Sequence, residues 1–307
     1  MGRFLLMPTT SLPSDSRRHA LAVLAMVAAT LLWSMAGVVT RHLHQQDGMV
    51  LVFWRSAFAA IGVALYLLRS GAGPLLATLR GSGPLLWVSA LSWGTMFTAF
   101  MLALSLTSVA QALIAESLGP LVAALLGLWV LGQRLPLRTW AAIALASLGM
   151  GWIVFHNLQS SFGQRQLLGL AIAMLVPLAA ASNWVSLRRA GARVPMVPAL
   201  MLGGALSALV VAWPALQHGI DGHDLFWLAF LGLFQLAAPG VFVVWAAQRL
   251  SPAEVSLLGL LEVVFGIAWT WLGAGEAPGP ATLTGGGLIL LALVGNEILA
   301  RWRPART

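Results

Sequence analysis

The chain has 307 residues, of which 59% are apolar and only 8% are charged, with a formal net charge of +8 and a mean hydropathy of +0.88. A soluble domain carries about 25% charged residues, so this composition indicates an integral membrane protein rather than a large soluble core. The sequence contains no cysteine, which excludes disulfides and any cysteine-based metal or redox site.

The apolar residues fall into runs of about 20 residues, the length that crosses roughly 30 Å of hydrocarbon as a helix. Ten such runs lie near residues 20–40, 49–68, 84–104, 109–131, 139–157, 167–187, 196–216, 225–247, 252–273 and 281–300. Gly and Pro cluster after the second run and before the tenth, as expected for turns. We therefore predict an all-α polytopic membrane protein with ten transmembrane helices.

The arginines predict the orientation of these spans, because cytoplasmic loops carry an excess of basic residues. With the N-terminus inside, 14 of the 17 arginines lie in cytoplasmic segments, only Arg41 and Arg165 lie in the opposite loops, and Arg55 lies within a span. Both termini are predicted to be cytoplasmic, and the use of arginine without lysine favours a bacterial inner membrane. The arginines sort by membrane side rather than into one patch, so we expect no nucleic-acid partner.

Two segments of the chain repeat at a constant offset of 143 residues, 105–133 and 248–276. Ser108 corresponds to Ser251 and Gln111 to Glu254, and each pair has the spacing of a helix capping box, which predicts a structural role for Glu254. The offset pairs span four with span nine and span five with span ten. The chain is thus predicted to be two five-helix repeats, inverted because each half has an odd number of spans, as in secondary transporters.

The predicted boundaries follow from this pairing. They are a cytoplasmic tail at 1–19, a first five-helix repeat at 20–157, an external linker at 158–166, a second repeat at 167–301 and a cytoplasmic tail at 302–307.

Two glutamates lie inside predicted spans, where a charge is costly and usually functional. At helical rise, Glu116 in span four lies roughly 12 Å below the outer surface and Glu262 in span nine roughly 15 Å from the cytoplasmic side, so their depths are similar. Arg55 is a candidate counter-ion for either glutamate or for a substrate carboxylate. The alternatives are structural hydrogen bonds for the glutamates and a structural salt bridge or a snorkelling side chain for Arg55. Pro120 is predicted to kink span four near Glu116.

Further polar and aromatic residues are predicted to lie deep in the spans: Trp33, Trp93, Asn183, Gln235 and Trp245. With the paired charges they would form an amphipathic cavity able to hold a zwitterion with an apolar side chain. The alternative for each deep tryptophan is ordinary packing between helices.

Several stretches resemble the drug/metabolite transporter superfamily, in its ten-helix EamA-type branch. They are LLWSMAG around Trp33, FWRSAFAA around Arg55, and ALIAESLGPLVAALLGLWVLGQRL with its partner in span nine. The resemblance covers nearly the whole chain and implies a central cavity that opens to one side at a time. It also implies export of small metabolites, with amino acids, including aromatic ones, among the cargo.

Other functions remain open as alternatives: a multidrug or nucleotide-sugar transporter of the same fold, or a non-transporting membrane scaffold. The six histidines fall at span ends or in loops, which predicts no buried metal cluster, and the chain has no GxSxG, HExxH or P-loop motif. We expect neither an enzyme nor a cofactor. The expected partners are a small-molecule substrate, the lipid bilayer and, for an antiporter, protons.

Overall fold

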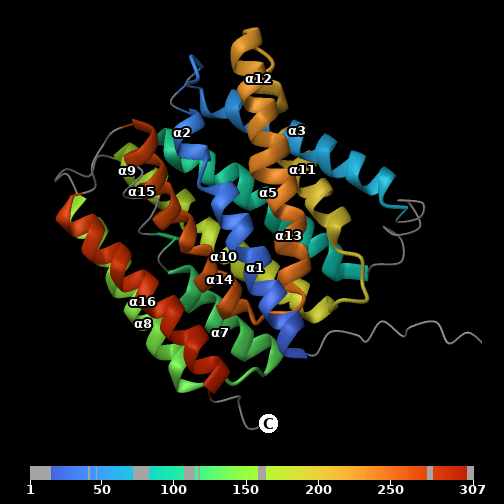
Figure 1. The fold of residues 1–307 in the computed structure, drawn as a ribbon. Helices are drawn as coiled ribbons and strands as arrows, with labels where there is room; N and C mark the ends of the chain where they lie inside the picture. Colours follow the sequence, from blue (N-terminus) through green and yellow to red (C-terminus); the bar gives the residue numbers. More distant parts are fainter. Residues whose placement is uncertain are drawn as a thin grey trace, which may run out of the picture.

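The computed structural model describes residues 15–40, 42–45, 47–71, 83–106, 115–116, 118–157, 164–274 and 279–302. Within these ranges every regular element is helical, and the helices pack into one bundle (Figure 1). In the described part of the chain, six helical segments are long and apolar enough to cross a membrane, and three shorter apolar helices accompany them. The predicted all-α, ten-helix membrane fold is confirmed.

The first repeat contains α1 (Asp15–Trp33) and α2 (Ala36–Thr40), which together form span one, then α3 (Gly48–Arg69), α5 (Gly83–Leu106), α7 (Gly119–Leu131) and α8 (Leu137–Asn157). The second repeat contains α9 (Gln164–Ala173) and α10 (Leu175–Ala190) in span six, then α11 (Val197–Ala215). Span eight follows as α12 (Gly222–Phe230), the π-helix η1 (Leu231–Ala237) and α13 (Ala238–Ala247). Span nine consists of α14 (Pro252–Gly259) and α15 (Leu261–Ala274), and span ten is α16 (Pro280–Trp302).

Some helices begin earlier than the apolar runs suggest. α1 begins at Asp15, inside the predicted tail, and α9 begins at Gln164, inside the predicted linker. Helices extend past their apolar stretch because a polar turn in water still satisfies its own backbone hydrogen bonds, and hydropathy alone does not mark that end.

Local capping explains where two helices start. The side chain of Asp47 accepts hydrogen bonds from the backbone N–H groups of Met49 (2.7 Å) and Val50 (3.4 Å) at the start of α3. The capping box predicted at Ser251 and Glu254 is present at the start of α14, with both reciprocal hydrogen bonds. Its predicted counterpart at Ser108 and Gln111 lies outside the described residues.

Close packing of α5 and α11 depends on small residues. A Cβ added at Gly203 of α11 would lie 2.3 Å from the Cβ of Trp93 and 2.9 Å from the carbonyl oxygen of Ala90, both on α5. Only glycine permits this approach, which is the usual role of small residues between membrane helices. The contact places Trp93 at the centre of the bundle. α8 and α16 form a separate pair along one side of the molecule (Figure 1).

The candidate substrate cavity

Within the described residues, five of the ten spans are interrupted or locally distorted near the middle of the bundle. Span one stops at Trp33 and resumes at Ala36, span six breaks at Met174, span eight contains a π-helix at 231–237, and span nine breaks at Leu260. In span four, α7 starts only at Gly119, three residues after Glu116. Discontinuous helices in inverted-repeat carriers expose backbone groups at the substrate site, and π-bulges are frequent at functional sites.

A cavity of about 80 Å³ lies where these interruptions meet. Its walls are the side chains of Trp33, Arg55, Trp93, Met96, Phe97, Phe100, Glu116, Val176, Gln235, Leu236 and Glu262. A second cavity of about 100 Å³ adjoins it and shares both glutamates, as well as Trp33, Met96 and Val176. Both repeats therefore contribute charged and aromatic groups to one central space.

Three polar atoms in the wall of the cavity have no hydrogen-bond partner among the described residues. They are Nε of Arg55, Nε1 of Trp93 and Oε1 of Gln235, and all three side chains are buried. Buried polar groups in proteins are nearly always paired, and each exception calls for an explanation such as a ligand or a water molecule. The residues of the cavity wall thus carry two unused donors and one unused acceptor, in addition to the two carboxylates.

The remaining bonds of these side chains hold them in place. Nη2 of Arg55 donates a long hydrogen bond to the carbonyl oxygen of Phe97 (3.4 Å). Nε2 of Gln235 donates to the carbonyl oxygen of Trp33 (3.2 Å), in the turn that interrupts span one. In the turn that follows, the indole N–H of Trp269 donates to Oγ of Ser34 (3.0 Å). The end of α1 therefore supplies the bond that holds the amide of Gln235 in the cavity wall.

Glu116, Glu262 and Arg55 line one cavity, together with Trp33, Trp93 and Gln235. Each glutamate is half-buried, because the cavity reaches its carboxylate. The two glutamates come from spans four and nine, which are equivalent spans of the two repeats. At the offset of 143 residues Glu116 corresponds to Gly259, so Glu262 lies three residues, about one helical turn, beyond the equivalent position. The inverted repeat brings the two spans together, and the cavity reaches both carboxylates.

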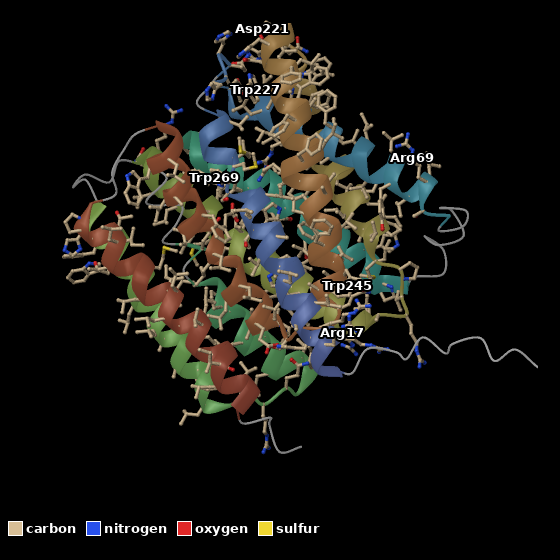
Figure 2. All side chains as sticks on the ribbon, viewed as in Figure 1. Arg17, Arg69, Asp221, Trp227, Trp245 and Trp269 are labelled. Atoms are coloured by element: carbon tan, nitrogen blue, oxygen red, sulfur yellow. The ribbon has the colours of Figure 1, made fainter. Side chains whose placement is uncertain are left out.

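Two of the predicted cavity residues lie elsewhere. Asn183 is fully buried between α10 and α5, where its Oδ1 accepts a hydrogen bond from Oγ of Ser89 (2.6 Å). Trp245 is 36% exposed on α13 and stacks under the guanidinium of Arg249, which lies 4.2 Å from the ring centroid. Figure 2 shows Trp245 near Arg17, at the opposite end of the molecule from Asp221 and Trp227. The position of a residue along its span predicts its depth in the membrane, but it does not predict on which face of the helix its side chain lies.

The prediction that Pro120 kinks a continuous helix is wrong. Pro120 lies in the first turn of α7, where its missing N–H has no helical partner to lose. The break falls before Pro120: the backbone N–H of Leu118 donates to the carbonyl oxygen of Ala115 (3.1 Å), and α7 begins at the next residue. The proline therefore lies in the first turn of a new helix that begins three residues after Glu116.

Sequence reasoning missed the apolar part of the cavity wall. On α5, Met96 and Phe97 lie about one helical turn from Trp93 and Phe100 lies about two turns from it. Val176 follows the break in span six, and Leu236 lies within the π-helix of span eight. The spacing of Trp93, Met96, Phe97 and Phe100 is a helical face, which is a usable signal once Trp93 is placed. Trp184 packs edge-on against Trp93 with 5.6 Å between ring centroids, and it lines the adjoining cavity.

A larger pocket of about 340 Å³ lies between α5, α10 and α11, but no charged side chain lines it. Leu91 and Val210 in its wall are exposed on the side of the bundle. An apolar recess on this surface suits lipid chains, so charge and centrality favour the smaller cavity as the functional site.

Two inverted five-helix repeats with interrupted helices around a midplane cavity define the architecture of a secondary transporter. The sequence pattern of the EamA-like transporter family matches residues 20–155 and 167–296, which is most of the chain. The protein belongs to the EamA-like transporter family and is a multi-pass membrane protein.

Two curated relatives are both called pseudopaline exporter CntI and come from Pseudomonas aeruginosa strains UCBPP-PA14 and PAO1. Each is 26% identical over 247 residues, covering 80% of this chain and 84% of the relative. A crystal structure with 21% sequence identity superposes with a TM-score of 0.76, covering 92% of this chain and 99% of its own. This likeness supports the fold alone.

Proposed function

We propose that this protein is a secondary exporter of small metabolites, with amino acids, including aromatic and other apolar ones, as its cargo. The observation that carries the proposal is the set of unpaired polar atoms around the central cavity, Nε of Arg55, Nε1 of Trp93 and Oε1 of Gln235, beside two carboxylates. The cargo leaves chemically unchanged, so no catalytic residue is assigned.

The chemistry of the cavity fits a zwitterion. The guanidinium of Arg55 suits a substrate carboxylate, while Glu262, Glu116 and Oε1 of Gln235 accept hydrogen bonds from an amine. The aromatic wall around Trp93 packs against an apolar side chain. Binding the substrate would pair polar atoms that are otherwise unpaired, which makes burial of the zwitterion favourable.

Transport proceeds by alternating access in this proposal, with the two repeats rocking about the cavity. Protons or the substrate gradient alone supply the driving force, and both are compatible with two carboxylates in the cavity. The protein lies in a bacterial inner membrane with both termini in the cytoplasm, as the arginine distribution favours.

Pseudopaline is a second candidate cargo. It is favoured by the similarity of this chain to the two pseudopaline exporters named above, with which it shares 26% sequence identity. Multidrug and nucleotide-sugar transport are further alternatives of the same fold. A competition panel separates them: unlabelled compounds of each class are tested for their ability to block flux of a labelled amino acid.

The decisive experiment is flux of radiolabelled Phe, Thr and Met in proteoliposomes, with and without an imposed pH gradient. We expect flux in the native protein and at least a tenfold loss, or a changed pH dependence, in Glu262→Gln. Glu254→Gln is the matched control, because it makes the same chemical change on span nine in the capping box, where glutamine also serves. Unchanged rate, affinity and pH dependence in Glu262→Gln would remove this residue from the mechanism, and no flux of any amino acid would remove the cargo.

A further inference from the structure

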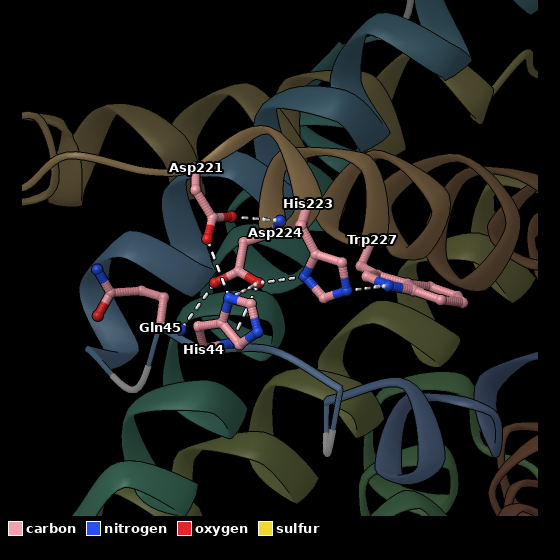
Figure 3. A network of polar contacts seen from close by, with 6 residues as sticks. All are labelled: His44, Gln45, Asp221, His223, Asp224 and Trp227. Atoms are coloured by element: carbon pink, nitrogen blue, oxygen red, sulfur yellow. Dashed lines mark hydrogen bonds and ion pairs between the residues drawn. The ribbon is translucent and has the colours of Figure 1, made fainter.

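Four side chains of metal-binding type meet at the end of the molecule where α12 begins (Figure 3). His44 lies in the connection between α2 and α3, whereas Asp221, His223 and Asp224 lie at the start of α12. One nitrogen or oxygen atom from each residue lies within 4.8 Å of the other three. This group is remote from the central cavity and has no part in the proposed transport site.

The distances between these atoms are close to those of a coordination shell. Nδ1 of His44 lies 3.0 Å from Oδ2 of Asp221 and 4.0 Å from Oδ1 of Asp224, and the same Oδ1 lies 3.0 Å from Nδ1 of His223. Ligand atoms at about 2.0 to 2.2 Å from a tetrahedral cation are separated by roughly 3.4 Å. These three distances differ from that separation by less than about 1 Å, and the remaining pairs, which all lie within 4.8 Å, differ from it by at most about 1.4 Å, so small side-chain shifts would admit an ion.

Backbone N–H groups hold both carboxylates in position. Oδ1 of Asp221 accepts from the N–H of Asp224 (2.7 Å), which is the capping bond of α12. Oδ2 of Asp224 accepts from the N–H of Gln45 (2.7 Å), and its Oδ1 accepts from the N–H of His44 (3.1 Å). Such outer contacts are what orient metal-ligating groups in known sites.

The ligand types select a class of ion. Two neutral imidazoles and two carboxylates with a divalent cation make a site of zero net charge, which matters because the side chain of Asp224 is only 2% exposed. Imidazole nitrogen suits zinc and neighbouring transition metals, whereas calcium and magnesium prefer oxygen ligands throughout.

The hydrogen bonds of His223 show which contacts must change when an ion binds. The indole N–H of Trp227 donates to Nε2 of His223 (3.1 Å), so the proton of this neutral ring lies on Nδ1, which donates to Asp224. Coordination through Nδ1 moves the ring proton to Nε2, where it faces the indole N–H. The Trp227 contact must then open.

We propose that His44, Asp221, His223 and Asp224 form a binding site for a divalent transition-metal cation such as Zn²⁺. The site joins segments 177 residues apart, one from each matched repeat, and links the α2–α3 connection to the start of span eight. The proposed metal site does not depend on the identity of the transported substrate.

The test is calorimetric titration of ZnCl₂ into the full-length chain in detergent micelles, purified without a polyhistidine tag, with CaCl₂ as a second titrant. We expect one equivalent of Zn²⁺ to bind, weak or no binding of Ca²⁺, and a Co²⁺ complex with the visible absorption of tetrahedral coordination. His44→Ala and His223→Ala should each weaken binding at least tenfold. Both rings are exposed, so these variants should fold.

His218→Ala is the matched control, because this exposed histidine lies in the same connection before α12 but bonds to the carbonyl oxygen of Pro214. Its Zn²⁺ affinity should equal that of the native chain. Trp227→Phe should bind Zn²⁺ as tightly as the native chain or more tightly. The proposal is overturned by the absence of one-site binding, by full binding in a His44→Ala, His223→Ala double variant, or by weaker binding in Trp227→Phe.

Discussion

Trp93 is fully buried, yet its indole N–H has no hydrogen-bond partner in the described part of the chain. A purely structural tryptophan would gain nothing from this arrangement, because an unpaired buried donor is unfavourable. The donor gains a partner if the substrate carries an acceptor. Arg55 and Gln235 present the same situation in the same wall.

We predict that Trp93→Phe raises the KM for transport about fivefold, the size of one lost hydrogen bond of about 1 kcal/mol. The removed N–H has no partner to lose, but the smaller ring leaves a cavity at this packed position, so the thermal unfolding midpoint should also fall. The measurement is concentration-dependent flux in proteoliposomes beside an unfolding curve in detergent. Trp213→Phe, 80% exposed on α11, is the control and should change neither quantity. A lower unfolding midpoint with unchanged KM would assign Trp93 to packing.

A second prediction at the scale of single residues concerns the effect of the Asp221 carboxylate on the pKa of His44. Its hydrogen bond to Asp221, together with the negative charge of that carboxylate, raises the pKa of His44 above its usual value. Asp221→Asn removes the charge that favours the protonated ring, so the pKa of His44 should fall. Ring-proton NMR titration of histidine-labelled protein with a chelator present measures it. Glu254→Gln, at the other end of the bundle, should leave the pKa of His44 unchanged, and an unchanged pKa in Asp221→Asn would contradict the assigned contact.

At the scale of elements, the interrupted helices explain how ten apolar segments enclose a polar site. Spans one and six are both interrupted, as are spans four and nine, and these pairs are equivalent in the inverted repeat. The N-cap of α7 at Leu118 and the break at Leu260 lie 142 residues apart, within one residue of the 143-residue offset of the sequence repeat. The repeat was recognisable from sequence, but only Pro120 signalled a break, and its position in the helix was mispredicted.

We predict that Gly203→Ala destabilises the protein by about 1 to 3 kcal/mol, because the added methyl group meets Trp93 and the backbone of Ala90 between α5 and α11. Tryptophan fluorescence during thermal unfolding in detergent would show a lower midpoint. Gly151→Ala on α8 is the control, because a Cβ there meets nothing within 4 Å and alanine favours the helix. Equal midpoints for the two variants would show that the α5–α11 contact relaxes freely.

At the scale of the whole molecule, the orientation in the membrane is open to a simple test. The chain has no cysteine, so a single introduced thiol is the sole target for a maleimide reagent. We predict that an impermeant maleimide labels Gln217→Cys in intact cells and labels Ala192→Cys only after the cells are broken. Both positions are exposed, in connections at opposite ends of α11. The reverse pattern would place the arginine-rich connections outside.

The sequence by itself determined the class, the ten helices and the twofold repeat, because hydropathy and repeat offset belong to local segments and survive any arrangement of the helices. It also predicted similar depths for Glu116 and Glu262, since helical rise converts position along a span into depth. Depth does not specify direction around the helix axis, so Trp245 and Asn183 were misplaced while Phe97 and Phe100 were missed. Only the tertiary structure decided which faces meet, where backbone breaks open the cavity, and that His44 reaches Asp221 across 177 residues, because these contacts arise from the packing of whole helices.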